Sequence, residues 1–68
     1  MANIAKVIRV IGQSQESFAE AARVAVREAG QTVRDISGAH VIEMSAVVQD
    51  GDITLFRTTV DIAFGVER

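Results

Sequence analysis

The dipeptide Asp50-Gly51 limits the possible folds more than any other feature, because it lies between two long segments rich in β-branched and aliphatic residues. Asp-Gly favours the two-residue turn of a β-hairpin, in which both turn residues adopt a positive φ. We therefore expect two antiparallel strands, over residues 39–48 and 52–66. A two-residue turn also fixes which residues face each other: Gln49 and Asp52, Val48 and Ile53, Met44 and Arg57, and His40 and Asp61.

The first half of the chain predicts a strand followed by a helix. Residues 4–11 are rich in Ile and Val and stop at Gly12, which is typical of a strand. The hydroxyl of Ser14 is placed to cap a helix over residues 15–34. The apolar positions of that helix recur at steps of three and four: Phe18, Ala21, Ala22, Ala25, Ala29, Thr32, Val33 and Ile36. Because most of them are alanine, we expect another surface to approach the helix backbone closely.

The order of these elements predicts an α+β fold of the β-α-β-β type. The first two strands run parallel, so the third and longest strand is antiparallel to both if it lies between them. The result is a three-stranded antiparallel sheet with strand order 1-3-2, wrapped around one helix. No repeat, linker or low-complexity segment interrupts the chain, and we expect a single domain over residues 1–68.

Both faces of the predicted hairpin are largely apolar. One face would carry Val41, Phe56, Val60, Ile62, Phe64 and Val66, with Glu43 and Thr58 as polar exceptions. The other would carry His40, Ile42, Met44, Ala46, Val48, Ile53, Leu55, Arg57 and Thr59. Because successive side chains of a strand alternate between faces, one face can pack on the helix while the other needs a partner chain.

The composition also indicates self-association. Small domains need disulfides, a metal or oligomerisation, because a chain this short buries only about 60% of its unfolded surface. The sequence has no Cys and a single His, His40, which removes disulfides and makes a structural zinc site within one chain implausible. Hydrophobic residues make up 49% of the 68-residue chain, more than one small core can bury. We therefore expect a homo-oligomer.

Charge and hydropathy argue against two classes of partner. The net charge is −2, and the seven Lys and Arg residues are scattered singly, unlike the basic patch of a nucleic-acid-binding protein. No apolar stretch approaches the roughly 20 residues of a membrane span. The first six residues lack the pattern of a signal peptide. We expect a cytoplasmic protein that binds neither nucleic acid nor a membrane.

The residues that enzymes use for catalysis are few. Thiol chemistry is impossible without Cys, and the serines have only His40 as a candidate base, with no Gly-x-Ser-x-Gly turn. The glycines are too scattered for a phosphate-binding loop. Asp50 and Asp52 could hold a weakly bound divalent ion, but turn chemistry explains them better, and they lack the spacing of an EF-hand loop. We expect no enzymatic activity.

Charged residues on the hairpin give the clearest hints of a binding site. His40 opposes Asp61 in the expected register, and this polar pair would make the imidazole more basic. Arg57 places a cation among apolar neighbours on the same face. Either it forms a salt bridge with Glu43 or Asp61 of another subunit, or it binds an anion or a planar ring at a subunit junction, since Arg does both. The sequence favours the salt bridge.

The chain resembles the dodecins over nearly its whole length. The residues that carry the resemblance are Lys6-Val7-Ile8, Gly12-Gln13-Ser14-Gln15-Glu16-Ser17-Phe18, Ala21-Ala22, Thr32-Val33-Arg34-Asp35-Ile36, Ala39-His40-Val41 and Val60-Asp61-Ile62-Ala63-Phe64. The resemblance implies a subunit whose sheet half-wraps its helix, assembled into a hollow homododecamer. It also implies storage, buffering or sequestering of a small molecule, typically flavins (riboflavin, FMN or FAD) held in pairs at subunit junctions.

Two positions depart from the flavin-binding dodecins. Those proteins have a Trp that stacks on the flavin ring where this chain has Gly38, and a Gln that hydrogen-bonds the ring edge where it has Arg57. Losing a Trp removes roughly 150–250 Å² of aromatic contact per site, so the resemblance implies weakened flavin binding. The chain is more similar to the branch without the Trp, some of whose members are described as calcium dodecins.

Two hypotheses follow from these residues. In the first, the protein is a non-enzymatic dodecamer that binds or stores a small molecule, with a site lined by Gly38, His40 and Arg57 and with flavin as a weak ligand. In the second, the same shell binds no flavin and serves assembly alone or binds ions, a divalent cation among them. No calcium-ligand motif can be matched residue by residue.

Overall fold

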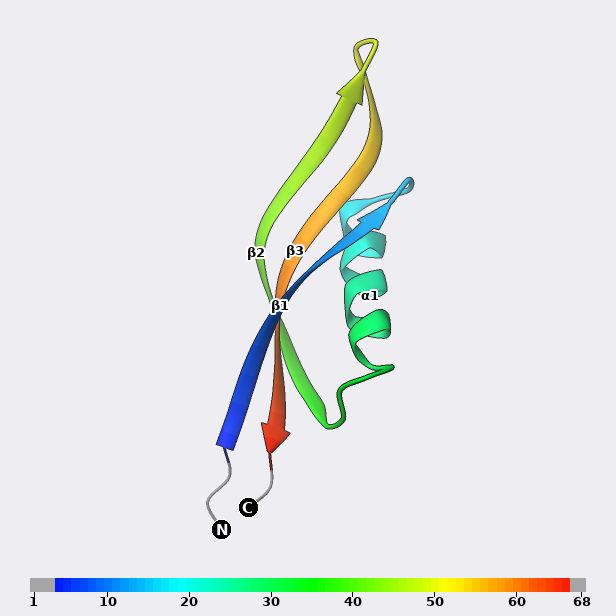
Figure 1. Ribbon diagram of the computed structural model, residues 1–68. Coiled ribbons are helices and arrows are strands. Elements are labelled where there is room, and N and C mark those ends of the chain that lie inside the picture. The colour runs from blue at the N-terminus through cyan, green and yellow to red at the C-terminus, as the bar shows by residue number, and fades with distance from the viewer. Residues whose placement is uncertain (1–3, 67–68) are drawn as a thin grey trace.

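The computed structural model describes residues 4–66, which form strand β1 (Ile4–Ser14), helix α1 (Phe18–Ala29), strand β2 (Ile36–Gln49) and strand β3 (Asp52–Val66). The three strands make one antiparallel sheet in the order β1-β3-β2. Helix α1 lies against one face of this sheet, and the β2–β3 hairpin extends past the start of the helix (Figure 1). The β-α-β-β fold and the strand order confirm the prediction.

Helix α1 is shorter than the predicted span of residues 15–34, and a different serine caps it. Ser17 is the N-cap, because its Oγ accepts a hydrogen bond from the N–H of Glu20 at 2.9 Å. Ser14, the expected cap, accepts from the N–H of Glu16 at 2.9 Å in the preceding turn. The helix ends at Ala29 with Gly30 as its C-cap. The apolar residues after Gly30 therefore belong to the connection and to β2.

The alanine face of α1 rests directly on the sheet. Ala25 and Ala29 pack with Val60 and Ile62 of β3, and all four side chains are buried. Partly buried side chains pack around this cluster: Ile8, Val10, Ala22, Val26 and Ile36. The close approach predicted from the alanine stripe is confirmed.

Gly12 of β1 shows how near the two layers are. A Cβ added at this position would overlap the carbonyl oxygen of Ala21 and lie 2.9 Å from the backbone nitrogen of Ala25. Both are main-chain atoms, so no side-chain rotation can relieve the overlap. Only glycine lets β1 pass the helix at this point.

Two contacts fix the start of α1 on β3. The hydroxyl of Thr58, which is 1% exposed, donates to the carbonyl oxygen of Phe18 at 2.9 Å. The ring of Phe18 meets the ring of Phe56 edge to face, with centroids 4.9 Å apart. The buried hydroxyl of Thr58 on the helix-facing side of the sheet therefore has the hydrogen-bond partner that a buried polar group needs.

The hairpin turn has the expected conformation. Asp50 and Gly51 have φ values of 54° and 77°, the positive pair that a two-residue turn of this type needs. The side chain of Asp52 accepts a hydrogen bond from the N–H of Ile53 at 3.0 Å. The two carboxylates at the tip are therefore explained by turn geometry.

The register of the hairpin differs from the prediction in its middle. The observed pairs are Gln49 with Asp52, Val48 with Ile53, Ser45 with Arg57, Met44 with Thr58 and His40 with Asp61. Pairing slips by one residue at Thr54 of β3 and slips back at Ile42 of β2, so both ends of the predicted hairpin match and its centre does not. A third shift lies between Ile36 and Gly38, before the predicted strand begins. A one-residue slip moves side chains to the other face. The expectation that Met44 and Ala46 share a face with Arg57 is therefore wrong, since they lie on the helix side. Glu43, expected on the face of Val41, is instead paired with Thr59 on the opposite face.

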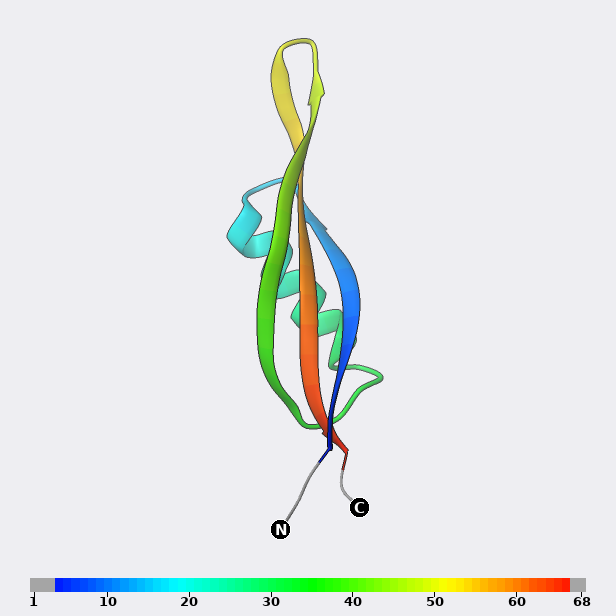
Figure 2. The same ribbon diagram turned by 90° about the vertical axis from the view of Figure 1, so that its left-hand side faces the viewer.

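Helix α1 covers β1 and β3 and barely reaches β2. Met44 and Val41, on the helix-facing side of β2, consequently stay 59% and 44% exposed. Figure 2 shows the opposite face of the sheet, which no helix or strand of residues 4–66 covers. Large apolar side chains are also exposed on β1 and near the hairpin tip: Ile4, Val7, Ile11, Val48 and Ile53. One copy of the chain therefore leaves apolar surface on both faces of its sheet.

We expect Gly12→Ala to destabilise the fold, because its methyl group would overlap the backbone of α1. Overpacking costs about 1–3 kcal/mol where side chains can adjust, and the cost is larger here because main chain has to move. Gly65→Ala is the matched control, since nothing lies within 4 Å of its Cβ. Urea unfolding at equal protein concentration should show a large fall in midpoint for Gly12→Ala alone. Equal midpoints would contradict the close approach.

We expect Met44→Asp to shrink the assembly, because it places a charge on the uncovered helix-side surface of β2, where a neighbouring copy would bury it. Leu55→Asp makes the same test on the opposite face of the sheet. Gln31→Asp, at an exposed position after α1, is the control. Light scattering should give smaller particles for the first two variants and an unchanged particle for the third. Wild-type size in both test variants would show that neither surface is a subunit contact.

Candidate functional site

The sheet face opposite α1, here called the outer face, consists of rows of cross-strand neighbours from β1, β3 and β2. The rows are Val7–Ala63–Gly38, Arg9–Asp61–His40, Ile11–Thr59–Glu43 and Gln13–Arg57–Ser45. These β3 residues alternate with the buried Thr58, Val60 and Ile62, which face the helix. Gly38, His40 and Arg57 are all exposed. The structure thus brings the three predicted site residues to one surface.

Gly38 and Arg57 are nevertheless far apart on the outer face of a single chain. Gly38 pairs with Ala63, which is six positions along β3 from Arg57. At about 3.3 Å per residue of strand, this separates the two rows by roughly 20 Å. His40 lies in the row next to Gly38. A small molecule cannot contact all three residues of one copy, so a site lined by all of them has to include a second copy.

Gly38 leaves the outer face open. Nothing lies within 4 Å of a Cβ built at this position, so a larger side chain fits there. Phe56 and Phe64 occupy helix-facing positions of β3, and Phe18 belongs to α1. Among residues 4–66, therefore, no aromatic ring is present on the outer face to stack on a planar ligand.

The centre of the outer face is an ion pair that sequence reasoning missed. Nε of Arg9 donates to Oδ1 of Asp61 at 2.7 Å, and Nη2 donates to Oδ2 at 3.1 Å. The hydrogen bond from Arg9 lowers the pKa of the Asp61 carboxyl despite its partial burial, and His40 acts in the same direction. The carboxylate that was expected to act on His40 is thus already paired. Extending the predicted strand order to the register of β1 on β3 would have revealed it.

The hydrogen-bond partner of Arg57 within the chain is an uncharged amide. Its Nε donates to Oε1 of Gln13 on β1 at 3.0 Å. The neighbour of Arg57 on β2 is Ser45, where the sequence predicted Met44. The salt bridge that the sequence favoured for Arg57 involves another subunit and stays a prediction.

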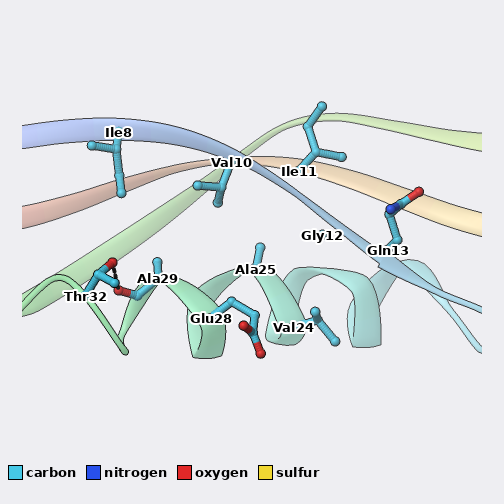
Figure 3. A pocket seen from close by; sticks show the side chains of 10 residues that line it. All are labelled: Ile8, Val10, Ile11, Gly12, Gln13, Val24, Ala25, Glu28, Ala29 and Thr32. Carbon is cyan, nitrogen blue, oxygen red and sulfur yellow. Dashed lines mark hydrogen bonds between the residues drawn. The ribbon is translucent and has the colours of Figure 1, made fainter.

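A groove of about 450 Å³ lies between the edge strand β1 and α1. It is lined by Ile8, Val10, Ile11, Gly12, Gln13, Val24, Ala25, Glu28, Ala29 and Thr32 (Figure 3). Ile8 and Val10 point toward the helix, whereas Ile11 points away from it. The lining is mostly apolar and includes none of the three predicted site residues. The candidate site is therefore the open outer face and not this groove.

Within the described part of the chain, no group of three or more His, Asp or Glu side chains is arranged to hold a metal ion. A divalent cation with several carboxylate ligands would therefore need residues from more than one copy. No helix formed by these residues is long and apolar enough to cross a membrane.

Comparisons with known proteins give concordant matches. A family model described as Dodecin matches residues 4–67. A calcium dodecin from Mycobacterium tuberculosis is 36% identical over 62 residues, which is 91% of this chain and 87% of that protein. The dodecin from Streptomyces davaonensis superposes with a TM-score of 0.95 at 24% identity, covering 100% of both chains. The crystal structure of the Mycobacterium tuberculosis calcium dodecin, described as calcium chelating with a novel calcium-binding site, has a TM-score of 0.80 at 39% identity and covers 90% of this chain and 87% of that one.

The ion pair predicts an acid-sensitive contribution to stability. Because the pKa of Asp61 is lower in the folded state, the pair stabilises the fold above about pH 4, and this contribution is lost as the pH falls through the folded-state pKa. Asp61→Asn should therefore unfold at lower urea than wild type near pH 7, and the two curves should converge in acid. Glu28→Gln, on the helix, is the control. A difference between wild type and Asp61→Asn that persists unchanged at about pH 2 would contradict this account.

Proposed function

This chain belongs to the dodecin family, and from that premise we propose that it binds and stores a small molecule, without converting it, inside a hollow homododecamer. The ligand sites lie where the outer faces of copies meet and are lined by Gly38, His40 and Arg57. One observation carries the proposal: roughly 20 Å separates Gly38 from Arg57 in one chain. A small ligand that contacts both must lie between two copies.

The exposed apolar side chains of the outer face support a site between copies. Val7 and Ile11 are 58% and 61% exposed in a single chain. They flank the Arg9–Asp61 ion pair on β1, in the rows that also hold Gly38 and Glu43. An apolar surface with a few well-placed polar groups is typical of small-molecule sites once it is enclosed. Association of copies would provide that enclosure.

Flavin fits this surface as a weak ligand. The outer face offers the hydrogen-bonding groups of His40 and Arg57 to the polar groups of a ligand. It offers no aromatic ring for stacking, because Gly38 stands at the position where the flavin-binding members carry Trp. Stacking contributes about 1–3 kcal/mol per ring in comparable aromatic contacts. We therefore infer a site of the flavin type with strongly reduced affinity.

A second candidate is a shell that binds calcium instead of an organic molecule. The 36% identical relative named calcium dodecin favours it. Glu43 lies one row from the ion pair and could supply a carboxylate from each copy. Calorimetric titration with CaCl₂ separates the candidates. Heat of binding that Glu43→Gln abolishes would favour the calcium shell, and its absence would favour the organic ligand.

We expect Gly38→Trp to strengthen riboflavin binding by one to two orders of magnitude, because the indole restores a stacking surface in open space. Arg57→Gln should add a smaller gain, since it removes a cation that neutral riboflavin cannot pair with, and Gln offers both a donor and an acceptor where Arg offers donors alone. Quenching of riboflavin fluorescence by wild type, the two single variants and the double variant measures these effects.

The matched control is Gly38→Leu, which adds an apolar side chain without a planar face. If Gly38→Leu binds riboflavin as tightly as Gly38→Trp, stacking is not the missing element. If the double variant assembles normally and shows no gain over wild type, Gly38 and Arg57 do not line a flavin-type site.

A further inference from the structure

Three of the five arginines among residues 4–66 contact a carboxylate of the same copy. Arg9 forms a bidentate pair with Asp61 on the outer face. Arg23 and Arg27 lie 3.5 Å and 3.7 Å from the carboxylate of Glu20 on α1. The charge of Arg9 is thus balanced one to one, whereas Arg23 and Arg27 share the single carboxylate of Glu20.

Arg57 is different because its hydrogen-bond partner is uncharged. Its Nε donates to the amide oxygen of Gln13 at 3.0 Å, and no carboxylate of residues 4–66 lies within 4.0 Å of it. Glu43, in the next row, is a nearby carboxylate on the outer face, while Asp61, two rows away, is paired with Arg9. The positive charge of Arg57 is therefore uncompensated by direct contact in one copy.

The hydrogen bond to Gln13 also decides which part of the guanidinium can bind a ligand. Of the five N–H donors of Arg, the one on Nε is used. The four on Nη1 and Nη2 remain, and these form the fork that binds the oxygens of a phosphate or carboxylate. Gln13 and Arg57 are paired directly across β1 and β3. Strand pairing therefore places Gln13 directly beside Arg57, where its amide oxygen can orient the fork.

Apolar side chains continue the outer face beyond this row. Leu55 pairs with Val47 next to the row of Arg57 and Ser45, and both are half-buried. A ligand that places a charged oxygen group on Arg57 can thus lay an apolar part on Leu55. The combination fits an organic molecule with a terminal oxyanion better than a bare ion.

We propose that Gln13 positions Arg57 to bind a terminal oxyanion, a phosphate monoester or a carboxylate, so that the site prefers the phosphorylated form of its ligand to the neutral form. This inference rests on the proposed storage function, because it names the chemical class that the same site selects. Gln13 is a positioning residue: it acts through Arg57. A neutral partner is essential to this role, because a carboxylate in its place would cancel the charge.

The test compares riboflavin with FMN, which differ by one phosphate group, and adds inorganic pyrophosphate as an oxyanion without a ring. The protein is the assembled wild type with the variants Gln13→Glu, Gln13→Ala, Arg57→Gln and Arg57→Lys. Arg23→Gln, on the helix surface, is the control. Flavin affinities come from fluorescence quenching, and pyrophosphate affinity comes from equilibrium dialysis with the radiolabelled ion.

We expect wild type to bind FMN about tenfold more tightly than riboflavin, because charge-assisted bonds to the fork exist for FMN alone. Gln13→Glu should abolish this ratio: its carboxylate still accepts from Nε but neutralises Arg57. Arg57→Gln should abolish it too. Gln13→Ala and Arg57→Lys should reduce the affinity ratio to a few-fold. Gln13→Ala loses the group that orients the guanidinium, and Arg57→Lys loses the guanidinium itself. Arg23→Gln should keep the full ratio.

Other outcomes separate this inference from the proposed function. Equal binding of riboflavin and FMN by wild type would overturn the inference and leave the storage function intact. An unchanged ratio in Gln13→Glu would overturn the role of Gln13. Binding of pyrophosphate that Gln13→Glu abolishes, without binding of either flavin, would support the inference and overturn a flavin-type site. Binding of none of the three probes would overturn both.

Discussion

The backbone contact between the alanine face of α1 and Gly12 of β1 is the constraint on which the rest of the structure depends. The two layers approach so closely that even a methyl group at Gly12 would overlap the helix main chain. Small residues permit this approach, but each buries little apolar surface. The core is accordingly thin: its largest fully buried side chains are Ile62, Val60 and Thr58. A narrow helix over a wide sheet leaves β2, the hairpin tip and the outer face uncovered, and we infer that other copies of the chain cover them.

The distribution of charged and apolar side chains on the outer face suits a site between copies. The Arg9–Asp61 pair neutralises its centre, and apolar side chains lie on both sides of that pair. Gly38 and Arg57 lie far apart on this face. Gly38 has no side chain and open space above it, whereas Arg57 is positively charged and hydrogen-bonded to Gln13. The groove between β1 and α1 accordingly contains none of the predicted site residues. Under the proposed function, assembly creates the site, so folding, association and binding depend on one another.

Local patterns in the sequence were sufficient to predict the element types and the strand order. The Asp-Gly turn, the alternation in β3 and the alanine stripe are each encoded within a few residues. The helix cap was harder, because Ser14 and Ser17 have the same capping chemistry three positions apart. Tertiary contact selects Ser17: the hydroxyl of Thr58 binds the carbonyl oxygen of Phe18, which fixes where the first turn starts. The end at Gly30 has a local signal that the longer apolar pattern obscured.

The middle of the hairpin register could not be predicted, because the slips at Thr54 and Ile42 cancel and neither residue is a recognised bulge signal. The candidate site was predictable as a set of residues on one face, since His40 keeps its place opposite Asp61. The side-chain contacts of Asp61 and Arg57 could not be predicted, because their partners lie on β1. Arg9 and Gln13 reach β3 only through a pairing between residues about fifty positions apart in the chain.

One copy of this chain leaves much of its own sheet uncovered, and we infer that it folds stably only with other copies. Sedimentation velocity of the wild-type protein over a dilution series, followed in parallel by far-ultraviolet circular dichroism, tests it most directly. We expect a particle many times larger than the 7.3 kDa chain, whose strand signal is lost together with the assembly on dilution or in urea. A folded species of 7.3 kDa that keeps its strand signal would contradict the account.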